Sequence, residues 1–590
     1  MRRIILTVAL LAIAAGMHAA PRFWGSLVPG AHPVGFQILE GQSAPGSAGW
    51  EPRPLEIAVW YPATAGTSGR VLSFGDYFAI AEDLRRRSAP GETDLRKTLS
   101  AAITGDVAAI PAERAQAILD TPMLGRRDAA ASAGPFPVVL WSARYGTTAA
   151  QAVLSEYLAS RGLVVAAVRP KQAVEKLPFE VKTLEEKLEE LDAQTDDLRG
   201  ALRTVRALPH AADERTALIA WSYAGESAWR VAQGDARIEL VIGLDTNVRA
   251  NWIYQPAEAL RAIDAAPRHF DIVSLDKTTP ELDGLAHGNF NMIEGMVPGI
   301  EGIERVQPWS KGGPIARRGY ETIAGRVAAA LEAAFARTRP RAYTALEIPT
   351  KESAVTAELY RAGGENGRCA ALFHQSGSSR GEYRTIAPEL VRMGYTVLAV
   401  DVRWGNRDRW NDVLNETAAR YGTAEAWERG DREKVAQIRA GESDDLDAAV
   451  DWLLANGCTG PIAVWGASIQ ANGVLELAIR RPDDVGAVVD VSPGEYKKDA
   501  PDRMRGIAAR VRVPVLVLWG RNEEDVSKPI FDALPAGAKW SYASRGRHGN
   551  AVFFEDPEAW TRVREFLHQA GTAGTAGWPK PRARQSPEWR

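Results

Sequence analysis

With 590 residues, the chain is too long for one domain of ordinary size, and two or more domains are expected. Hydrophobic residues make up 45% of the chain and charged residues 25%, so each half can form a full globular core. The formal net charge of -3 excludes a strongly basic protein and gives no reason to expect a nucleic-acid partner.

The N-terminus has the pattern of a secretory signal peptide over residues 1–20. Met1-Arg-Arg precedes an apolar run over residues 4–15, which is too short to span a bilayer. Cleavage is expected near Ala19 or Ala20. No later segment is apolar enough to span a membrane, so we expect a soluble, exported protein, periplasmic or extracellular.

The first half alternates short apolar runs with helical patterns, which predicts a mostly parallel sheet flanked by helices. Residues 74–122 have a largely helical pattern and are predicted to be an insertion. Thr183 and Glu186 predict a capping box at the start of one long helix. The predicted strands are 34–40, 54–61, 137–141, 163–168, 217–221, 240–244 and 270–275, and the predicted helices are 149–160, 183–208 and 318–336.

The second half repeats this scheme after a charged, proline-containing linker. Its predicted strands are 370–374, 396–400, 462–465, 485–489 and 513–519, with helices over 444–455 and 557–569. The chain therefore predicts two tandem, related domains. Their bounds are 21–337 and 346–570, joined by a linker over 338–345 and followed by a disordered tail over 571–590.

Residues 403–441 of the second half are polar and rich in tryptophan, which predicts a lid-like insertion. Trp404, Trp410 and Trp427 either form an aromatic wall for a ligand or pack in the core of this insertion.

Ser468 lies at a turn between the strand 462–465 and a helical pattern that begins at Ile469. Gly466 and Ala471 are small, as a sharp turn requires where the backbone passes close to itself. A strand, turn and helix with serine at the tip form a nucleophile elbow, which exposes the hydroxyl above a parallel sheet. Ser468 is therefore the predicted nucleophile of the second half.

A second copy of this pattern, Ala-Trp-Ser-Tyr-Ala-Gly, surrounds Ser222 in the first half. Ala220 stands where glycine is usual at such an elbow. Two predictions stay open for the first half: a second active site at Ser222, or a degenerate partner domain.

A serine nucleophile needs a base to take its proton and an acid to orient that base. In α/β hydrolases these residues follow in the order serine, acid, histidine. His287 and His548 each lie in a His-Gly loop after the last predicted strand of a half, and they are the predicted bases. The candidate acids of the first half are Asp245, Asp276 and Asp283; in the second half Glu523 is preferred over Glu524, Asp525 and Asp490.

Backbone N–H groups must stabilise the oxyanion of an acyl-transfer reaction. One comes from the residue after the nucleophile, which is Tyr223 or Ile469. The other comes from the loop after an earlier strand, at Ala143 or Arg144 in the first half and at Gln375 or Ser376 in the second. His374 belongs to the same loop and is predicted to be structural.

The first half resembles the platelet-activating-factor acetylhydrolase-like group. The resemblance rests on Trp141-Ser-Ala-Arg-Tyr-Gly146, the elbow at Ser222, Asp245 and His287-Gly-Asn-Phe290. In that group the catalytic aspartate follows the strand after the elbow, and the histidine lies in an H-x-[NS]-F context. The resemblance therefore implies Asp245 as the acid and His287 as the base.

The second half is similar to dienelactone-hydrolase-like proteins of the α/β-hydrolase superfamily. The similarity rests on residues 373–383, Gly466-Ala-Ser468, Ser492-Pro-Gly-Glu-Tyr496 and His548-Gly549. Gln470 departs from the small residue usual after the elbow, which predicts a narrower site. Together the two resemblances imply tandem α/β-hydrolase domains, each a mostly parallel sheet flanked by helices.

Cys369 and Cys458 are the two cysteines of the chain. Each precedes a predicted strand, and in an α/β-hydrolase sheet these two strands are parallel neighbours. Both cysteines would then lie at the same end of the sheet, and an oxidising compartment favours a bridge between them. We predict a disulfide.

The sequence thus predicts a secreted serine hydrolase that cleaves a small-molecule carboxylic ester through an acyl-enzyme. Ser468 attacks, His548 serves as general base and then acid, and Glu523 orients the imidazole. The alternatives are a peptidase or acylaminoacyl hydrolase of the same fold, and a non-catalytic binding protein built from hydrolase domains. No metal or nucleotide cofactor is expected, since no metal-ligand spacing, P-loop or G-x-G-x-x-G occurs.

Overall fold

A computed structural model describes residues 21–45, 51–80, 94–105, 107–142, 147–170, 183–246, 268–339, 341–363, 367–496, 500–536 and 539–573. The chain divides into two compact units, and the main boundary falls between Thr338 and Arg339, within the predicted linker. The predicted signal peptide and residues 574–590 of the predicted tail lie outside the described residues.

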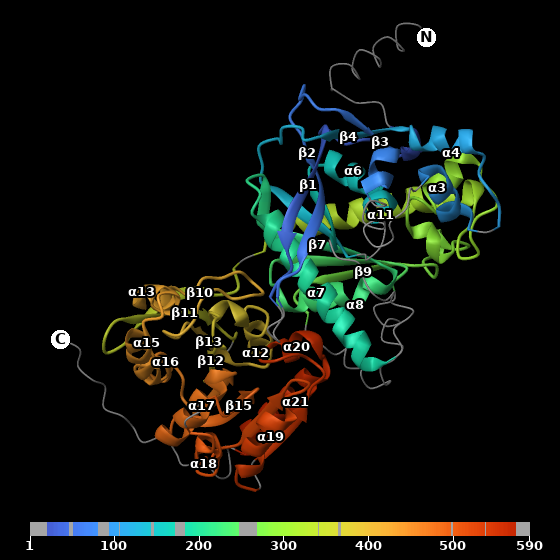
Figure 1. Cartoon of the computed structure of the whole chain (residues 1–590). Coiled ribbons are helices and arrows are strands. Elements are labelled where there is room, and N and C mark those ends of the chain that lie inside the picture. The colour runs from blue at the N-terminus through green and yellow to red at the C-terminus, as the bar shows by residue number, and fades with distance from the viewer. Residues whose placement is uncertain are drawn as a thin grey trace. The chain divides into compact units, whose positions relative to one another are not determined.

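The first unit is built on a sheet of nine strands in its described part (Figure 1). These are β1 (Val34–Gln42), β2 (Pro54–Pro62), β3 (Val71–Ser73), β4 (Pro122–Arg127), β5 (Phe136–Ser142), β6 (Val164–Pro170), β7 (Ala211–Trp221), β8 (Ile238–Leu244) and β9 (Asp271–Leu275). Their order is β3-β4-β1-β2-β6-β5-β7-β8-β9. β2 is antiparallel to β1 and β6, while β6, β5, β7, β8 and β9 are parallel, as short buried apolar runs separated by helices require.

Helices cover both faces of the first sheet. α6 (Ala152–Ser160) and α11 (Gly313–Ala336) contribute to one large core with Trp60 and Trp141. α7 (Leu184–Arg206) begins at the predicted capping box of Thr183 and Glu186, which is confirmed. α8 (Gly225–Gly234) lies beside α7, since Arg230 binds Asp192 at 3.1 Å. The shorter helices are η1 (Arg22–Trp24), α3 (Leu95–Thr104), α4 (Ala112–Leu119), α5 (Thr147–Ala150), η3 (Ser222–Ala224), η5 (Pro280–Leu282), η6 (His287–Phe290) and α10 (Met296–Glu301).

The second unit contains a sheet of eight described strands in the order β10-β11-β13-β12-β14-β15-β16-β17. The strands are β10 (Thr344–Pro349), β11 (Ala354–Tyr360), β12 (Cys369–Phe373), β13 (Thr396–Val400), β14 (Ile462–Ala467), β15 (Val485–Val491), β16 (Val515–Trp519) and β17 (Lys539–Ala543). β11 is antiparallel to both of its neighbours, and the remaining pairs are parallel. The exchange of the third and fourth strands is the order of an α/β-hydrolase sheet, and the first unit shows the same exchange at β6 and β5.

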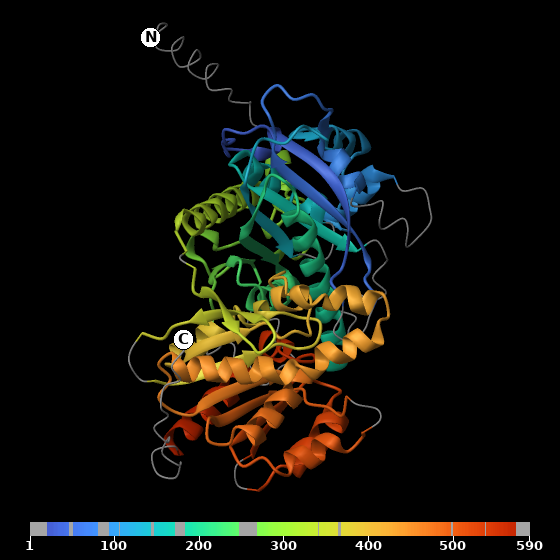
Figure 2. The same cartoon turned by 90° about the vertical axis from the view of Figure 1, so that its left-hand side faces the viewer.

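Two groups of helices cover the second sheet, and Figure 2 views the orange helices of this unit in front of its strands. One core contains residues of α16 (Glu442–Ala455), α17 (Ile469–Arg480), α18 (Arg503–Ala508) and α19 (Glu524–Ala533). The other contains residues of α12 (Ala387–Arg392), α20 (Ala551–Glu555) and α21 (Glu558–Ala573). η7 (Arg380–Tyr383) follows β12, and the predicted insertion forms α13 (Glu416–Tyr421), α14 (Thr423–Glu428) and α15 (Arg432–Ala440).

Several elements differ from the sequence predictions. The linker prediction was too long, because Thr344 and Ala345 already pair with Leu359 and Glu358 in the sheet. The prediction missed β10, β11 and β17, and it missed β3 and β4 within the expected helical insertion. β3 has three residues and β17 is only partly buried, so neither carries the apolar run on which the strand predictions relied.

The predicted disulfide between Cys369 and Cys458 is present, with the Cα atoms 5.9 Å apart. It forms because β12 and β14 are parallel neighbours, as predicted. Within the described residues, no helix is both long and apolar enough to cross a membrane, and no cluster of acidic, histidine or cysteine side chains is arranged to hold a metal ion.

Candidate active sites

In the first unit, Ser222 lies directly after β7 and begins the η3 turn that leads into α8. Its backbone φ is +56°, in the left-handed region that non-glycine residues rarely adopt. Such a strained turn lifts the serine side chain out of the sheet, as at a nucleophile elbow. Ala220 is fully buried two residues earlier, so this turn accommodates the methyl group that departs from the usual glycine.

His287 links Ser222 to Asp245 through hydrogen bonds. Its Nε2 lies 2.7 Å from the Oγ of Ser222, and its Nδ1 lies 2.6 Å from the Oδ2 of Asp245. The serine comes from the end of β7, the aspartate from the end of β8, and the histidine begins η6. The structure therefore brings together the three residues predicted for the first half in the order nucleophile, base and orienting acid.

The carboxylate of Asp245 is suited to orient an imidazole. Burial alone raises its pKa, but the hydrogen bond and charge of His287, together with Lys277, outweigh burial and hold the pKa below its usual value. Asp245 is thus ionised at neutral pH. The two rival acids bind within their own turns: Asp276 accepts the Thr278 N–H at 2.8 Å, and Asp283 accepts the Gly284 N–H at 2.9 Å.

Two side chains near His287 were not anticipated from the sequence. The ring of Trp221 is stacked on the imidazole. The carboxyl of Glu294 accepts a 2.5 Å hydrogen bond from Ser310, and a Cβ atom on Gly288 would collide with both side chains. This close packing explains why glycine follows His287. Tryptophan before the serine was visible in the sequence, but nothing in the pattern indicated that it stacks on a distant histidine.

In the second unit, Ser468 follows β14 with φ +56° and ψ −117°. α17 begins at the next residue, without the intervening turn of the first unit. This tighter turn explains Gly466, because a Cβ atom there would collide with the backbone oxygen of Gln470. The side chain of Gln470 is itself buried and binds Glu442, so it does not fill the space above Ser468.

Glu523 and His548 are directly hydrogen-bonded through Nδ1 of the imidazole. Glu523 also accepts a hydrogen bond from the Ser492 hydroxyl at 2.7 Å and one from the Gly520 N–H at 2.7 Å. Burial raises the pKa of Glu523, but the hydrogen bond to His548 and the other donors outweigh it and lower the pKa. Its rivals Glu524 and Asp525 are exposed in the first turn of α19.

The other rival acid, Asp490, makes no hydrogen bond to His548 in the described part of the chain. It is fully buried within β15, and neither carboxyl oxygen has a hydrogen-bond partner among the described residues. Burial raises its pKa well above the usual value.

Ser468 differs from Ser222 in its partner. No hydrogen bond joins Ser468 to His548 in the described part of the chain. Tyr496 lies nearby: burial raises the pKa of its hydroxyl, and Ser468 acts in the opposite direction. The Tyr496 hydroxyl also donates to the carbonyl oxygen of Ser492 at 2.6 Å. The second constellation is thus assembled between base and acid but not between nucleophile and base.

The predicted oxyanion donors fall into three cases. The backbone N–H of Ile469 has no partner in the described ranges, as a donor to an incoming oxyanion requires, while the predicted donor at Tyr223 stays a prediction. The Gln375 N–H already donates to Glu382 at 3.2 Å, whereas the next N–H, at Ser376, has no described partner. Ala143 lies outside the described residues.

His374 has the structural environment predicted for it. It is fully buried, its Nε2 accepts the Val402 N–H at 3.1 Å, and its Nδ1 lies 2.8 Å from the Gln375 carbonyl oxygen. Burial lowers its pKa to about 4, so the ring is neutral and holds the loop after β12.

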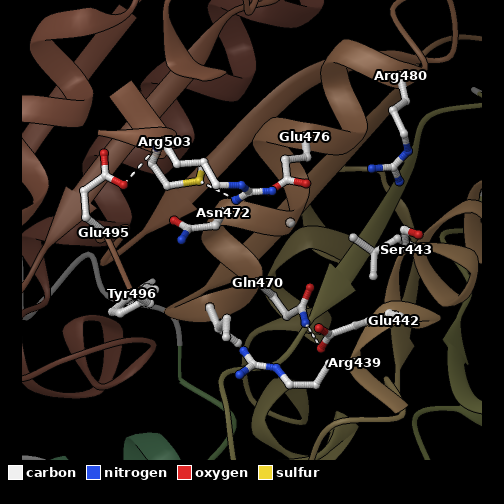
Figure 3. Close-up of a pocket in the computed structure, with 15 residues that line it drawn as sticks. Arg439, Glu442, Ser443, Gln470, Asn472, Glu476, Arg480, Glu495, Tyr496 and Arg503 are labelled. Atoms are coloured by element: carbon white, nitrogen blue, oxygen red, sulfur yellow. Dashed lines mark hydrogen bonds and ion pairs between the residues drawn. The ribbon is translucent and has the colours of Figure 1, made fainter. Parts of the chain in front are cut away.

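A pocket of about 310 Å³ opens beside the second elbow (Figure 3). Ile469 and Tyr496, the neighbours of Ser468, border it. Most of its lining is polar: Arg439, Glu442, Ser443, Gln470, Asn472, Glu476, Arg480, Glu495 and Arg503. In Figure 3 Arg503 reaches toward Glu476, with which it forms a 2.7 Å ion pair.

The predicted tryptophans of the insertion divide between core and surface. Trp404 and Trp410 are buried, as the core interpretation requires, while Trp427 is 67% exposed and contacts Trp404 edge to face. Trp404 also donates a 3.0 Å hydrogen bond to Ser376, and Arg439 of the pocket lies over its ring.

Two sheets with this strand order, each bearing a serine on a strained turn between strand and helix, define two α/β-hydrolase domains in tandem. No protein-family profile matches the chain, and no curated protein matches it significantly.

Solved structures resemble parts of the chain. Dienelactone hydrolase from Anabaena variabilis is 22% identical, covering 40% of this chain and 99% of its own, with a TM-score of 0.30. Ferulic acid esterase from Streptomyces cinnamoneus is 19% identical, covering 52% and 92%, with a TM-score of 0.36. Acylaminoacyl peptidase from Pyrococcus horikoshii is 13% identical, covering 40% and 43%, with a TM-score of 0.31. Likeness at this level concerns the fold, so the chemistry is argued from the two sites themselves.

Proposed function

We propose that the protein is a serine hydrolase that cleaves a carboxylic ester through an acyl-enzyme, with Ser222, His287 and Asp245 as its working triad. The observation that carries this proposal is the unbroken chain of hydrogen bonds from Ser222 through His287 to Asp245. A serine hydroxyl is a poor nucleophile until an adjacent base takes its proton, and here the base lies within hydrogen-bond distance.

In the proposed reaction the Oγ of Ser222 attacks the ester carbonyl as Nε2 of His287 takes the hydroxyl proton. In this reaction the Tyr223 N–H donates to the oxyanion that forms. Collapse of this intermediate expels the alcohol, which receives the proton from His287. Water then attacks the acyl-enzyme by the same route, while ionised Asp245 stabilises the imidazolium.

Ser468, His548 and Glu523 form the proposed second site. The sequence interpretation placed the main activity here and left the first half as either a second site or a degenerate partner. The hydrogen-bond geometry favours Ser222 instead, because Ser222 is hydrogen-bonded to His287, whereas no hydrogen bond joins Ser468 to His548 in the described part of the chain. The polar pocket beside Ile469 supports a polar substrate at this second site.

Export to the periplasm or beyond is also part of the proposal. It is supported by the N-terminal sequence pattern and by the disulfide between Cys369 and Cys458, since stable disulfides are rare in reducing cytosol.

Fluorophosphonate labelling of the folded protein, followed by peptide mapping, tests the proposed function. We expect rapid labelling at Ser222, loss of that label in Ser222→Ala, and slower labelling at Ser468. Failure to label either serine in folded protein would contradict the hydrolase and leave a non-catalytic binding protein. Comparison of matched ester and peptide substrates separates an esterase from a peptidase of the same fold.

A further inference from the structure

We propose that Glu382 is a positioning residue of the second site, where it ties the loop that carries the oxyanion donor to the loop that carries His548. This inference rests on the proposed function of Ser468 and goes beyond it, because Glu382 belongs to neither the triad nor the oxyanion hole.

Glu382 lies in η7 and is 1% exposed. Its two carboxyl oxygens bind different loops: Oε2 accepts the backbone N–H of Gln375 at 3.2 Å, and Oε1 accepts the side-chain amide of Asn550 at 2.7 Å. Gln375 follows β12 and Asn550 lies two residues after His548. A single buried carboxyl therefore joins two segments that are 175 residues apart in sequence and carry different parts of the proposed chemistry.

In the loop after β12, the bond to Glu382 determines which N–H remains available. With the Gln375 N–H committed to Glu382, the next N–H in the loop, that of Ser376, is the one without a partner in the described residues. The loop is held on either side of this N–H: His374 contacts the Gln375 carbonyl oxygen at 2.8 Å, and Trp404 donates to the Ser376 hydroxyl at 3.0 Å. We therefore assign the loop's oxyanion donor to Ser376 rather than Gln375.

In the histidine loop, the bond to Glu382 fixes the position of Asn550. The Oδ1 of Asn550 accepts the indole N–H of Trp465 at 3.1 Å, so both polar atoms of the Asn550 side chain have partners. The intervening Gly549 donates its N–H to Ser492 at 2.9 Å, and Ser492 in turn binds Glu523. A Cβ atom on Gly549 would collide with the Gln375 side chain, so the two loops are in direct contact.

The geometry explains why an acid occupies this position. Two donors approach from opposite loops, and both oxygens of a carboxyl group can accept, with or without a proton on the group, whereas the amide nitrogen of a glutamine cannot accept. Burial raises the pKa of Glu382 to about 8, and nearby Asp408 acts in the same direction. Burying an acid is costly unless it is hydrogen-bonded, and here the hydrogen bonds are also what align the two loops.

The test uses a Ser222→Ala parent, so that only the second site reports. Glu382→Ala and Glu382→Gln are compared for the rate of fluorophosphonate reaction at Ser468 and for kcat and KM with p-nitrophenyl acetate. Glu389→Gln is the matched control, because Glu389 is a buried glutamate of the same unit that pairs with Arg392 and Arg564.

We expect Glu382→Ala to lower kcat by about tenfold or more, the effect of a misplaced oxyanion donor, with KM within about twofold of the parent. The kcat of Glu382→Gln should lie between those of the parent and Glu382→Ala, since glutamine keeps one acceptor oxygen. The Glu389→Gln control should change kcat by less than about twofold, even where its melting temperature falls as much as that of the Glu382 variants. Because both residues act through one bond, Asn550→Ala should lower kcat little further in the Glu382→Ala background.

Equal losses of kcat in Glu382→Ala and the Glu389 control at matched melting temperature would overturn the positioning role, as would a change confined to KM. A parent that does not react at Ser468 would overturn the second active site itself and the role of Glu382 with it. The two failures are therefore distinguishable.

Discussion

The indole of Trp221 lies nearly parallel to the imidazole of His287, with ring centroids 5.4 Å apart and planes inclined by 16°. Trp221 directly precedes Ser222, so the residue before the proposed nucleophile stacks on the proposed base. The Nε2 of His287 meets Ser222 and its Nδ1 meets Asp245.

Replacing Trp221 with alanine should therefore lower kcat at the first site while leaving the fold intact. We expect a loss of about threefold to tenfold, because an aromatic pair is worth roughly 0.5–1.5 kcal/mol. Trp221→Phe keeps a stacking ring and should retain most of the rate. Measurements in a Ser468→Ala background isolate the first site; equal rates for all three proteins would show that the stack does not orient His287.

Asp245→Asn should be far more damaging than the same change at either rival acid. Loss of the carboxylate leaves the imidazole in the wrong tautomer and is expected to lower kcat by roughly 10³- to 10⁴-fold. Asp276→Asn and Asp283→Asn, whose side chains bind within their own turns, should stay within about twofold. Steady-state kinetics on the three purified variants, with melting temperatures as the folding control, decides the assignment.

In the second site, the corresponding comparison is among three consecutive acidic residues. Glu523→Gln should slow labelling of Ser468 by about a hundredfold or more, because Glu523 binds His548 directly. Glu524→Gln and Asp525→Asn alter exposed side chains and should leave the labelling rate within about twofold. A larger effect at either exposed residue would mean that the acid has been misassigned.

Asp490→Asn should stabilise the second unit, and more at higher pH. Because burial raises the pKa of Asp490 in the folded state, the unfolded chain releases this proton first as pH rises. The free energy of unfolding therefore decreases as the pH rises from the ordinary carboxyl pKa to the raised pKa of Asp490. The melting temperature gained by the variant should be larger at about pH 8 than at about pH 5. A gain independent of pH would contradict the titration of Asp490.

Removing the disulfide should destabilise the second unit substantially. The bridged cysteines are 89 residues apart, and closing a loop of that length stabilises a fold by roughly 4–5 kcal/mol in the chain-entropy model. We expect Cys369→Ala/Cys458→Ala to shift the denaturant midpoint of the second unit downward, with the first unit unchanged. Fluorescence and labelling at Ser222 follow the two transitions separately; an unshifted midpoint would mean that the bridge adds little stability.

Much of the fold follows from the sequence, because parallel strands buried on both faces appear as short, nearly continuous apolar runs. The runs before Ser222 and Ser468 are examples, and they correspond to β7 and β14. β10 and β17 escaped prediction because they lie at the edges of their sheet, where exposure interrupts the apolar pattern. Edge strands are specified by pairing with distant neighbours, which local pattern does not reveal.

The site was predictable at the level of residue types and chain order. Serine, acid and histidine recur in the chain order typical of α/β hydrolases, and the structure brings Ser222, Asp245 and His287 together. The sequence did not predict that His548 is hydrogen-bonded to Glu523 but not to Ser468 among the described residues, because this depends on how the loops pack. The same holds for Glu382, whose partners are defined only after two loops have packed.

Both serines hold their backbone at φ +56°, a conformation in which glycine is comfortable and a serine costs about 1–3 kcal/mol. Typical proteins unfold at a net cost of only 5–15 kcal/mol, so two such residues consume a noticeable part of the stability reserve. In each half, the strained backbone of one serine lowers stability while it exposes the serine hydroxyl. Backbone strain of this kind concentrates at functional positions, which agrees with the roles proposed for both serines.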